Sequence, residues 1–393
     1  MSAMIFMGPL YRREQEREIQ EHIRHGGSNA GTIFQWSIID GLQANLGHGI
    51  RVINALPVGT FPKAYSRLIL PDESWKLGGV ACQEIGCINL PFLKQWGRFR
   101  RAKKLIRGLR NEEVMLCTTY LPFLLALHKL HPSNRLTVIA TDLPEYADMH
   151  QVSRLRKLLR QIHTRMVYHY LRRADRFVLL TEQMAGPLQV GHRPYLVMEG
   201  ICGLSTQQEI PVQRSRAILY SGRLNTRYGI ADLLEAFAQL QDNTAELWLC
   251  GNGEMEPTIR TAAQQDTRIR FFGFLPQDQV RQLQCSAAVL VNPRPNNEEY
   301  TKYSFPSKTM EYLASGTPVV MHRLDGIPAE YDVFLHYIPG NTPQELKVAL
   351  ETVLNTEPQT LRQQGDAAQR FIFEKKSALA QTKRILQWLE GEA

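Results

Sequence analysis

Residues 303–320 have the sequence YSFPSKTMEYLASGTPVV, which predicts a loop, a helix, a glycine stop and an apolar strand. The helix is expected to start near Pro306, with Ser307 as its cap. The free N–H groups of such a helix start form an anion site, and Lys308 adds a positive charge where a phosphate could sit. Glu311 lies one turn further along the same face, where its carboxylate could accept two hydrogen bonds from ribose hydroxyls. The alternative is an ordinary capped helix with a solvated glutamate.

Short apolar runs alternate with helical patterns from one end of the chain to the other. The predicted strands lie at 4–8, 50–55, 137–141, 176–181 and 195–198 in the first half, and at 217–221, 245–251, 269–272, 287–292 and 318–321 in the second. The predicted helices lie at 32–46, 153–173, 230–240, 255–264, 307–314 and 342–354. Strands separated by helices predict parallel, doubly wound α/β sheets, and the pattern occurs twice.

The chain has 393 residues, which is too long for one ordinary domain, so we expect two. A polar segment near 199–216 precedes a new strand–helix unit and predicts domains at 1–200 and 201–376. A last helix at about 377–389 should dock, because its apolar side chains lie roughly on one face: Leu379, Ile385, Leu386 and Leu389. We expect residues 377–393 to pack back toward the first domain.

Composition narrows the classes of protein. The six cysteines are scattered without a CxxC pair, which disfavours structural zinc and a disulfide framework. The N-terminus lacks a signal pattern and no stretch reaches the ~18 apolar residues that span a bilayer, so we expect a cytoplasmic protein. Residues 1–200 hold 27 Lys and Arg against 16 Asp and Glu, although the whole chain has a net charge of only +8. This basic half indicates a polyanion, a phosphorylated substrate or an acidic membrane as partner, with a solvated basic face as the alternative.

A second strand–turn–helix unit occupies residues 220–230, with the sequence YSGRLNTRYGI. Gly222 forms the turn and places a loop at the carboxyl end of a strand, where doubly wound folds bind ligands. Arg223 and Arg227 of this loop can pair with diphosphate oxygens. A solvated loop is the alternative.

The stretch 303–320 closely resembles the donor-site signature of the family 4 retaining glycosyltransferases, which is Glu, seven residues, Glu, a small-residue turn and Pro-Val. Glu311 matches the second Glu and would be the ribose ligand. Tyr303 stands where the first Glu would fall, so Glu298 or Glu299 is the candidate for that carboxylate. The version found here resembles a polysaccharide-building branch of the family.

Further matches follow in the order that the resemblance implies. In the family pattern Gly-Arg-Leu, three residues, Lys-Gly, Tyr228 takes the place of the Lys. Residues 249–254, 272–275 and 325–330 resemble the later glycine turns and the segment that flanks the nucleotide base. The implied donor-binding residues are Gly222, Arg223, Arg227, Gly251, Phe274, Ser307, Lys308, Thr309 and Glu311.

The first half resembles the family more loosely. Residues 25–32 form a glycine-rich loop ahead of a helix, where the family's first domain approaches donor phosphate and acceptor, or else a merely flexible loop. A second candidate segment, 141–145, follows an apolar strand. The implied acceptor-binding residues are Ser28, Asn29, Gly31, Asp142 and Glu145. A helix cap without chemistry is the alternative for Asp142.

The resemblance implies a GT-B fold, in which two Rossmann-like domains, acceptor-binding and donor-binding, face a cleft. The implied reaction moves a sugar from a nucleoside diphosphate sugar, UDP-sugar favoured, to a hydroxyl of a saccharide acceptor with retention. The residues that would carry it are Asp142, Arg223, Lys308 and Glu311. We expect no metal and no further cofactor, since cationic side chains can neutralise the diphosphate and no Asp-x-Asp motif is present.

Two basic stretches with interleaved apolar residues, 92–110 and 153–173, favour an anionic membrane surface as a partner. We therefore expect a peripheral protein at the inner face of the plasma membrane, with a polyprenyl-diphosphate-linked acceptor. Core-facing helices with charged backs are the alternative. A sugar-nucleotide epimerase of GT-B architecture is the alternative enzyme. A dinucleotide-dependent oxidoreductase is disfavoured because GxGxxG is absent, and a nucleic-acid binder would leave the donor motifs unexplained.

Overall fold

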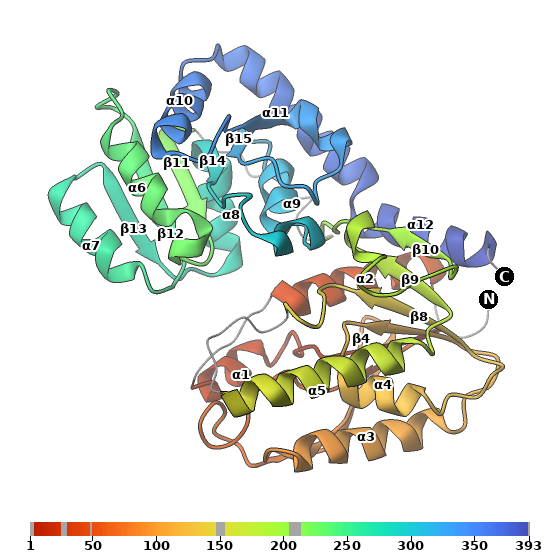
Figure 1. Cartoon of the computed structure of the whole chain (residues 1–393). Coiled ribbons are helices and arrows are strands. Elements are labelled where there is room, and N and C mark those ends of the chain that lie inside the picture. The colour runs from red at the N-terminus through yellow and green to blue at the C-terminus, as the bar shows by residue number, and fades with distance from the viewer. Residues whose placement is uncertain (1–3, 25–29, 48, 147–153, 204–213, 392–393) are drawn as a thin grey trace. The chain divides into compact units, whose positions relative to one another are not determined.

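The computed structural model describes residues 4–24, 30–47, 49–146, 154–203 and 214–391. The chain forms two compact units (Figure 1). The first contains Met1–Leu204 together with Ala378–Ala393, and the second contains Ser205–Ser377. The chain therefore leaves the first unit once and returns to it with its last helix.

The first unit is built on an eight-stranded sheet with the order β10-β9-β8-β7-β1-β2-β5-β4. The strands are β1 Met4–Gly8, β2 Ile50–Asn54, β4 Glu73–Leu77, β5 Val80–Glu84, β7 Glu113–Cys117, β8 Arg135–Ala140, β9 Arg176–Leu179 and β10 Tyr195–Val197. A separate antiparallel pair joins β3 Ile69–Leu70 to β6 Cys87–Ile88. The helices are α1 Glu16–His22, α2 Ala30–Leu46, α3 Leu93–Ile106, α4 Leu121–Leu127, α5 Arg154–Leu171 and α12 Ala378–Gly391.

The predicted parallel sheets are confirmed, and one edge strand of the first sheet departs from them. Strand β4 runs antiparallel to β5. The two strands are joined by Gly78 and Gly79, which have φ angles of 53° and 87°. A two-residue turn with positive φ at both positions reverses the chain at once, as in a hairpin, so the next strand cannot be parallel.

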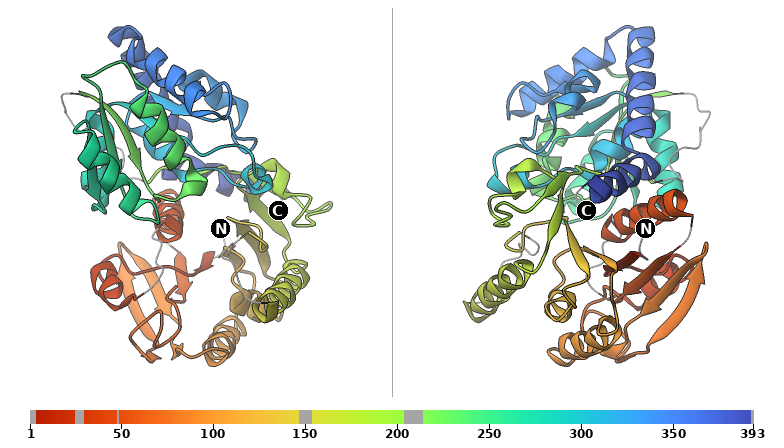
Figure 2. Two further views of the ribbon diagram at one scale, coloured as in Figure 1. Left: turned by 60° about the vertical axis from the view of Figure 1, so that its left-hand side comes forward. Right: turned by 90° about the vertical axis from the view of Figure 1, so that its right-hand side faces the viewer.

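Helix α12 packs against α2 inside the first unit, as Figures 1 and 2 show. The two helices approach so closely that a side chain at Gly41 would overlap the Ala378 carbonyl. Ile385, Leu386 and Leu389 are buried in the core that α2 helps to form, whereas Leu379 is 46% exposed and does not share the docked face.

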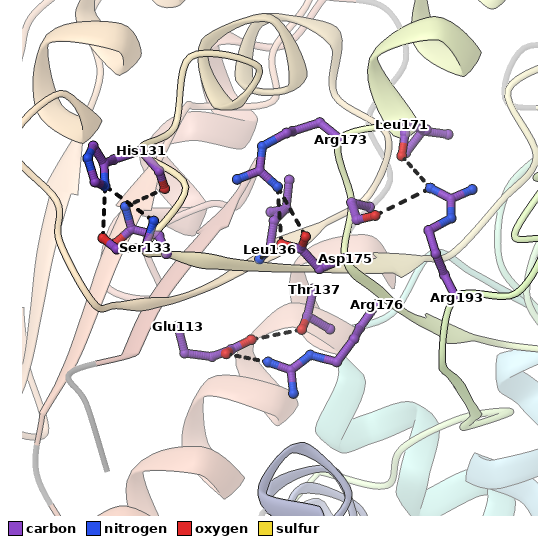
Figure 3. A network of polar contacts seen from close by, with 12 residues as sticks. Glu113, His131, Ser133, Leu136, Thr137, Leu171, Arg173, Asp175, Arg176 and Arg193 are labelled. Carbon is purple, nitrogen blue, oxygen red and sulfur yellow. Dashed lines mark hydrogen bonds and ion pairs between the residues drawn. The ribbon is translucent and has the colours of Figure 1, made fainter. Parts of the chain in front are cut away.

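A buried polar network lies in the middle of this sheet (Figure 3), and one of its members also bonds to α12. The Glu113 carboxylate on β7 forms an ion pair with Arg176 on β9 at 2.7 Å. It also accepts a 2.8 Å hydrogen bond from the Thr137 hydroxyl on β8. Arg176 also donates to the carbonyl of Leu389 at 3.0 Å. Burial raises the pKa of Glu113, while Arg176 and Thr137 oppose that rise. The charges of Glu113 and Arg176 thus lie inside the fold, and each would be costly to bury without the other.

The second unit has a six-stranded parallel sheet with the order β13-β12-β11-β14-β15-β16. The strands are β11 Ser215–Ser221, β12 Glu246–Cys250, β13 Ile269–Gly273, β14 Ala287–Asn292, β15 Val319–Met321 and β16 Leu335–Tyr337. The helices are α6 Ile230–Ala238, α7 Glu256–Gln265, α8 Gln277–Ser286, α9 Ser307–Ala314, α10 Pro343–Leu354 and α11 Pro358–Lys375. The strand order reverses between β11 and β14, so the loops after these two strands diverge at the edge where doubly wound folds bind ligands.

Candidate functional site

The loops after β11 and β12 come together at the carboxyl edge of the second sheet. Gly222 and Gly251 have φ angles of 149° and 137°. The Gly222 amide donates to the Cys250 carbonyl at 2.8 Å, and a side chain at Gly251 would overlap the Gly222 carbonyl. The positive φ favours glycine at both positions, and at Gly251 the close approach of the Gly222 backbone also leaves no room for a side chain. The two predicted glycines therefore line one edge of the sheet.

Helix α9 presents its start to this edge, but Ser307 is not its cap. The N-cap is Pro306, with φ −68° and ψ 118°, and no side chain caps the helix. Proline fixes a non-helical residue ahead of the first turn, so the exposed Ser307 becomes the first helical position. Thr309, predicted to bind the donor, is buried, and its hydroxyl lies 4.0 Å from the Met321 sulfur. The structure thus turns the Thr309 side chain to the core.

Lys308 lies against Gly222, where a Cβ atom would overlap the end of the lysine side chain. Its Nζ donates to the Tyr220 hydroxyl at 3.3 Å, and that hydroxyl donates to the Arg223 carbonyl at 2.7 Å. Burial lowers the pKa of Lys308 to about 8; Glu311 opposes this effect, and the nearby arginines Arg294 and Arg223 reinforce it. A bound anion would relieve this penalty on the ammonium.

Glu311 is partly buried one turn after Lys308. Burial raises the pKa of its carboxyl, and Lys308 together with a hydrogen bond from Gln284 opposes the rise. The neighbouring Tyr312 hydroxyl accepts a 3.0 Å hydrogen bond from the Ser221 amide and so anchors α9 to the end of β11. Gln284 also donates to the Ser221 hydroxyl at 3.2 Å. Gln284 and Tyr312 hold Glu311, the predicted ribose-binding residue, in place. The sequence analysis identified neither of them.

The structure adds a cation that was not predicted. Arg294, only 9% exposed, follows β14, and its guanidinium lies 4.5 Å from the centre of the Tyr300 ring. Arg227 lies 5.4 Å from Tyr228 and 5.2 Å from the same Tyr300 ring. The position of Arg294, directly after a predicted strand, is the same signal that identified Arg223.

The other side chains predicted on the donor side are exposed. Phe274 follows β13 and is 78% exposed, so its side chain is available to a ligand. Glu298 and Glu299 are both exposed, and Glu299 pairs with Lys302 at 3.0 Å. Arg223 has an exposed side chain beside the Gly222 turn.

Among the acceptor-side predictions, Asp142 follows β8 in the first unit. The Asp142 side chain is exposed to solvent, but the protein around it desolvates the carboxyl enough to raise its pKa to about 6, and a hydrogen bond from Thr141 opposes the rise. Glu145 accepts a 2.6 Å hydrogen bond from the Tyr168 hydroxyl on α5. Gly31 lies in the first turn of α2, where its carbonyl accepts a hydrogen bond of 3.1 Å from the Gln35 side chain. Ser28 and Asn29 lie outside the described residues.

The described residues contain neither a candidate metal cluster nor a helix that could span a membrane. No group of three or more His, Cys, Asp or Glu side chains there could hold a metal ion. Within the same ranges, no helix is both long and apolar enough to cross a bilayer.

Residues 215–356 match the family model described as "Glycosyl transferases group 1". The chain contains a group 1 glycosyl transferase domain. This domain covers the second sheet from β11 to the end of α10 and includes Gly222, Lys308 and Glu311.

Two relatives match part of this chain. It is 29% identical over 170 residues to the D-inositol 3-phosphate glycosyltransferase of Corynebacterium glutamicum (strain R), covering 39% of each chain. It is also 29% identical over 140 residues to the amylovoran biosynthesis glycosyltransferase AmsK of Erwinia amylovora, covering 34% of each. The chain thus spans less than two fifths of the length of these relatives.

The fold extends beyond the matched domain. The structure of HepE from Anabaena in complex with UDP covers 100% of both chains with a TM-score of 0.66 at 14% identity. At that identity the likeness shows the fold alone. The predicted GT-B fold class is confirmed, whereas the cleft between its domains stays a prediction.

Proposed function

We propose that the chain is a family 4 retaining glycosyltransferase, which moves a sugar from a nucleoside diphosphate sugar, UDP-sugar favoured, to a hydroxyl of a saccharide acceptor. The observation that carries this proposal is the placement of Lys308 and Glu311 on α9 beside the Gly222 turn. A desolvated cation next to bare backbone at a helix start suits a diphosphate. A carboxylate one turn away suits the ribose.

The chemistry asked of these residues is electrostatic. As the bond between the sugar and the diphosphate breaks, negative charge grows on the leaving oxygen, and Lys308 and Arg223 stabilise it. The acceptor oxygen bonds to the same face of the sugar carbon, and its proton passes to the leaving diphosphate. Glu311 holds the nucleoside throughout. Asp142 and Glu145 of the first unit contact the acceptor in this proposal.

Thermal unfolding with a panel of nucleotide sugars tests the donor site. A ligand at 100 times its dissociation constant adds about 2.7 kcal/mol of stability, which is readily measured. We expect stabilisation in the natural chain and little in Lys308→Gln. Absence of stabilisation by every nucleotide sugar would overturn the proposal.

Radiolabelled transfer separates the enzyme classes. A labelled sugar that moves to an extracted saccharide acceptor supports the transferase. Conversion of the sugar nucleotide to its epimer without transfer supports the alternative, an epimerase of the same architecture.

The lipid-linked acceptor and the membrane surface belong to the same proposal. The burial of some basic residues reduces the number that could contact lipid. Lys94 and Arg98 of the 92–110 stretch are buried. Lys94 donates to the Val58 carbonyl, and Arg98 donates to the Leu56 carbonyl at 2.7 Å. These two cations belong to the core and cannot serve as lipid contacts.

The outer side of α3 suits an anionic bilayer better. Phe92 and Trp96 are 80% and 58% exposed. The Arg100 guanidinium lies 4.7 Å from the Trp96 ring, and Lys103 and Lys104 follow on the same helix. Aromatic side chains beside cations are typical of proteins that sit at the headgroup level of a membrane.

Sedimentation with vesicles tests this surface. We expect binding to vesicles with anionic lipid, weak binding to neutral ones, and release by salt. Glu substitutions at Arg100, Lys103 and Lys104 should abolish binding and spare transfer to a soluble acceptor. Glu substitutions at Lys63, Lys76 and Lys129, exposed lysines of the same unit outside both basic stretches, are the matched control. Equal binding to anionic and neutral vesicles would show that the outer side of α3 is an ordinary solvated face and not a surface for anionic membranes.

A further inference from the structure

The cations at the donor edge of the second unit are not equally balanced by carboxylates. Four of them lie near the Gly222 turn: Arg223, Arg227, Arg294 and Lys308. Glu311 faces Lys308, and the exposed Glu298 faces Arg227. The other two cations form no ion pair with a carboxylate of the described ranges. Two positive charges, those of Arg223 and Arg294, are therefore left without a counter-charge.

Arg294 reaches this edge from the loop after β14, whereas Arg223 reaches it from the loop after β11. The two loops touch, because a Cβ atom at Gly229 would overlap the carbonyl of Pro293, the residue before Arg294. Both loops leave the sheet where the strand order reverses, which is the point at which doubly wound folds bind ligands. The two unbalanced arginines thus enter the candidate site from adjoining loops.

Arg294 acts on Lys308, the cation that the proposed function places beside the diphosphate. Burial lowers the pKa of Lys308, Glu311 opposes this effect, and Arg294 reinforces it more strongly than Arg223 does. Burial also raises the pKa of Tyr220, whose hydroxyl accepts a hydrogen bond from Lys308, and Arg294 opposes that rise. An anion bound at Lys308 therefore lies within reach of the charge on Arg294.

The contacts that Arg294 makes inside the protein do not replace an anion. Its side chain is buried, its guanidinium lies 4.5 Å from the centre of the Tyr300 ring, and a terminal nitrogen lies 3.3 Å from the Ser304 hydroxyl. Its Nε has no hydrogen-bond partner among the described residues. A ring face attracts a cation, but neither the ring nor the hydroxyl carries a negative charge. Because a buried guanidinium without a counter-charge is costly, a bound anion would stabilise it.

A diphosphate that joins a nucleoside to a sugar has one negative charge on each phosphate, which matches the two unbalanced arginines. We propose that Arg294 is a diphosphate-binding residue of the donor site and acts there together with Arg223. Its guanidinium can hold phosphate oxygens through two parallel hydrogen bonds. Tyr228 stands where the family pattern has a lysine, so Arg294 supplies a cation that the loop after β11 lacks. This assignment rests on the proposed function, because it assumes that the diphosphate lies beside Lys308.

Calorimetric binding to the full chain tests the assignment. The probes are UDP, which has the diphosphate, and uridine, which lacks it. Arg294→Gln can still donate a hydrogen bond to Ser304 but has no charge. It should bind UDP at least about ten-fold more weakly, which is the usual scale for losing a hydrogen bond to a charged group. It should bind uridine as the natural chain does.

Two variants are matched controls. Ser304→Ala removes the hydroxyl partner of Arg294, and Arg260→Gln removes another ring-stacked arginine of the same unit, 4.7 Å from Phe271. Both should keep the natural affinity for UDP. If Arg294 acted only by holding Ser304 ahead of α9, Ser304→Ala would instead lose as much affinity as Arg294→Gln.

The outcomes separate the role of Arg294 from the proposed function. Unchanged affinity for UDP in Arg294→Gln would overturn the assignment and leave the transferase intact. Equal losses for UDP and uridine, or an equal loss in Ser304→Ala, would overturn a direct contact with the diphosphate. Absence of UDP binding by the natural chain would overturn the assignment together with the proposed UDP-sugar site.

Arg294→Lys decides the question should Arg294→Gln fail to fold. Lysine keeps the charge but cannot form two parallel hydrogen bonds with phosphate oxygens. This variant should bind UDP about three-fold or more weakly and uridine normally. Full affinity for UDP in Arg294→Lys would then overturn the assignment.

Discussion

The titration of Lys308 gives a quantitative test of the donor site. Burial lowers its pKa from 10.5 to about 8, so about half of the free molecules carry a neutral Lys308 at pH 8. At about 1.36 kcal/mol per pKa unit, this drop corresponds to roughly 3 kcal/mol against the ammonium form. A diphosphate bound beside Nζ would offset that cost and return the pKa toward its ordinary value.

Donor binding should therefore take up protons above neutral pH. If the pKa returns to 10.5 in the complex, uptake is close to zero at pH 6.5, about 0.5 proton at pH 8 and about 0.75 at pH 8.5. Affinity should also fall as pH rises above about 8, because the free lysine must first be protonated.

Titration calorimetry with UDP-glucose, in buffers that differ in ionisation enthalpy, measures the uptake directly. Lys308→Arg keeps the charge but does not titrate in this range, so its uptake should vanish. Lys347→Arg changes a lysine that pairs with Glu351 on α10, and it should behave like the natural chain. Zero uptake in the natural chain at pH 8.5, or equal uptake in Lys308→Arg, would refute the reasoning.

The remaining predictions concern the ribose contact, the metal requirement, the acceptor side and the core. Glu311→Gln should lower transfer ten-fold or more, on the order of 1.4 kcal/mol, and near-normal donor affinity and turnover would contradict its role. Transfer should survive EDTA, and a loss that Mg²⁺ or Mn²⁺ restores would show the diphosphate site misread. Since the Asp142 carboxyl is protonated below its pKa of about 6, transfer should fall as pH drops through that value, and Asp142→Asn should lack this acid limb. Arg176→Met leaves the Glu113 carboxylate buried without its cation, so denaturant unfolding should show a loss of about 3–5 kcal/mol. In that variant, Glu113→Gln should recover part of the stability, and a loss below about 1 kcal/mol would contradict a buried pair.

Local signals predicted much of the second unit. The helix expected at 307–314 has those bounds, since proline and glycine fix both of its ends locally. The loop after β11 was predicted by the same kind of signal. The cap was misjudged because Pro306 and Ser307 are both common at helix starts, and only backbone geometry distinguishes their roles.

Long-range contacts account for what the sequence did not predict. Strand β7, which pairs with β1 and β8, is a short run flanked by polar residues, and its place in the sheet depends on partners far along the chain. The burial of Arg98 is equally invisible to local pattern, because a carbonyl 42 residues away accepts its hydrogen bond. The antiparallel β4 could have been predicted, since Gly78 and Gly79 are the residues that a tight hairpin requires.

The pairing of α2 with α12 has a consequence for how the protein is made. Roughly 330 residues separate the end of one helix from the start of the other, and at 5–20 residues per second a ribosome needs about 15 to 70 s to add them. During that time the apolar face of α2, which includes Trp36 and Ile39, lacks the helix that later covers it. The second unit emerges complete in the interval and can fold first. The nascent first unit is the part that needs protection from aggregation, although it leaves the ribosome earlier.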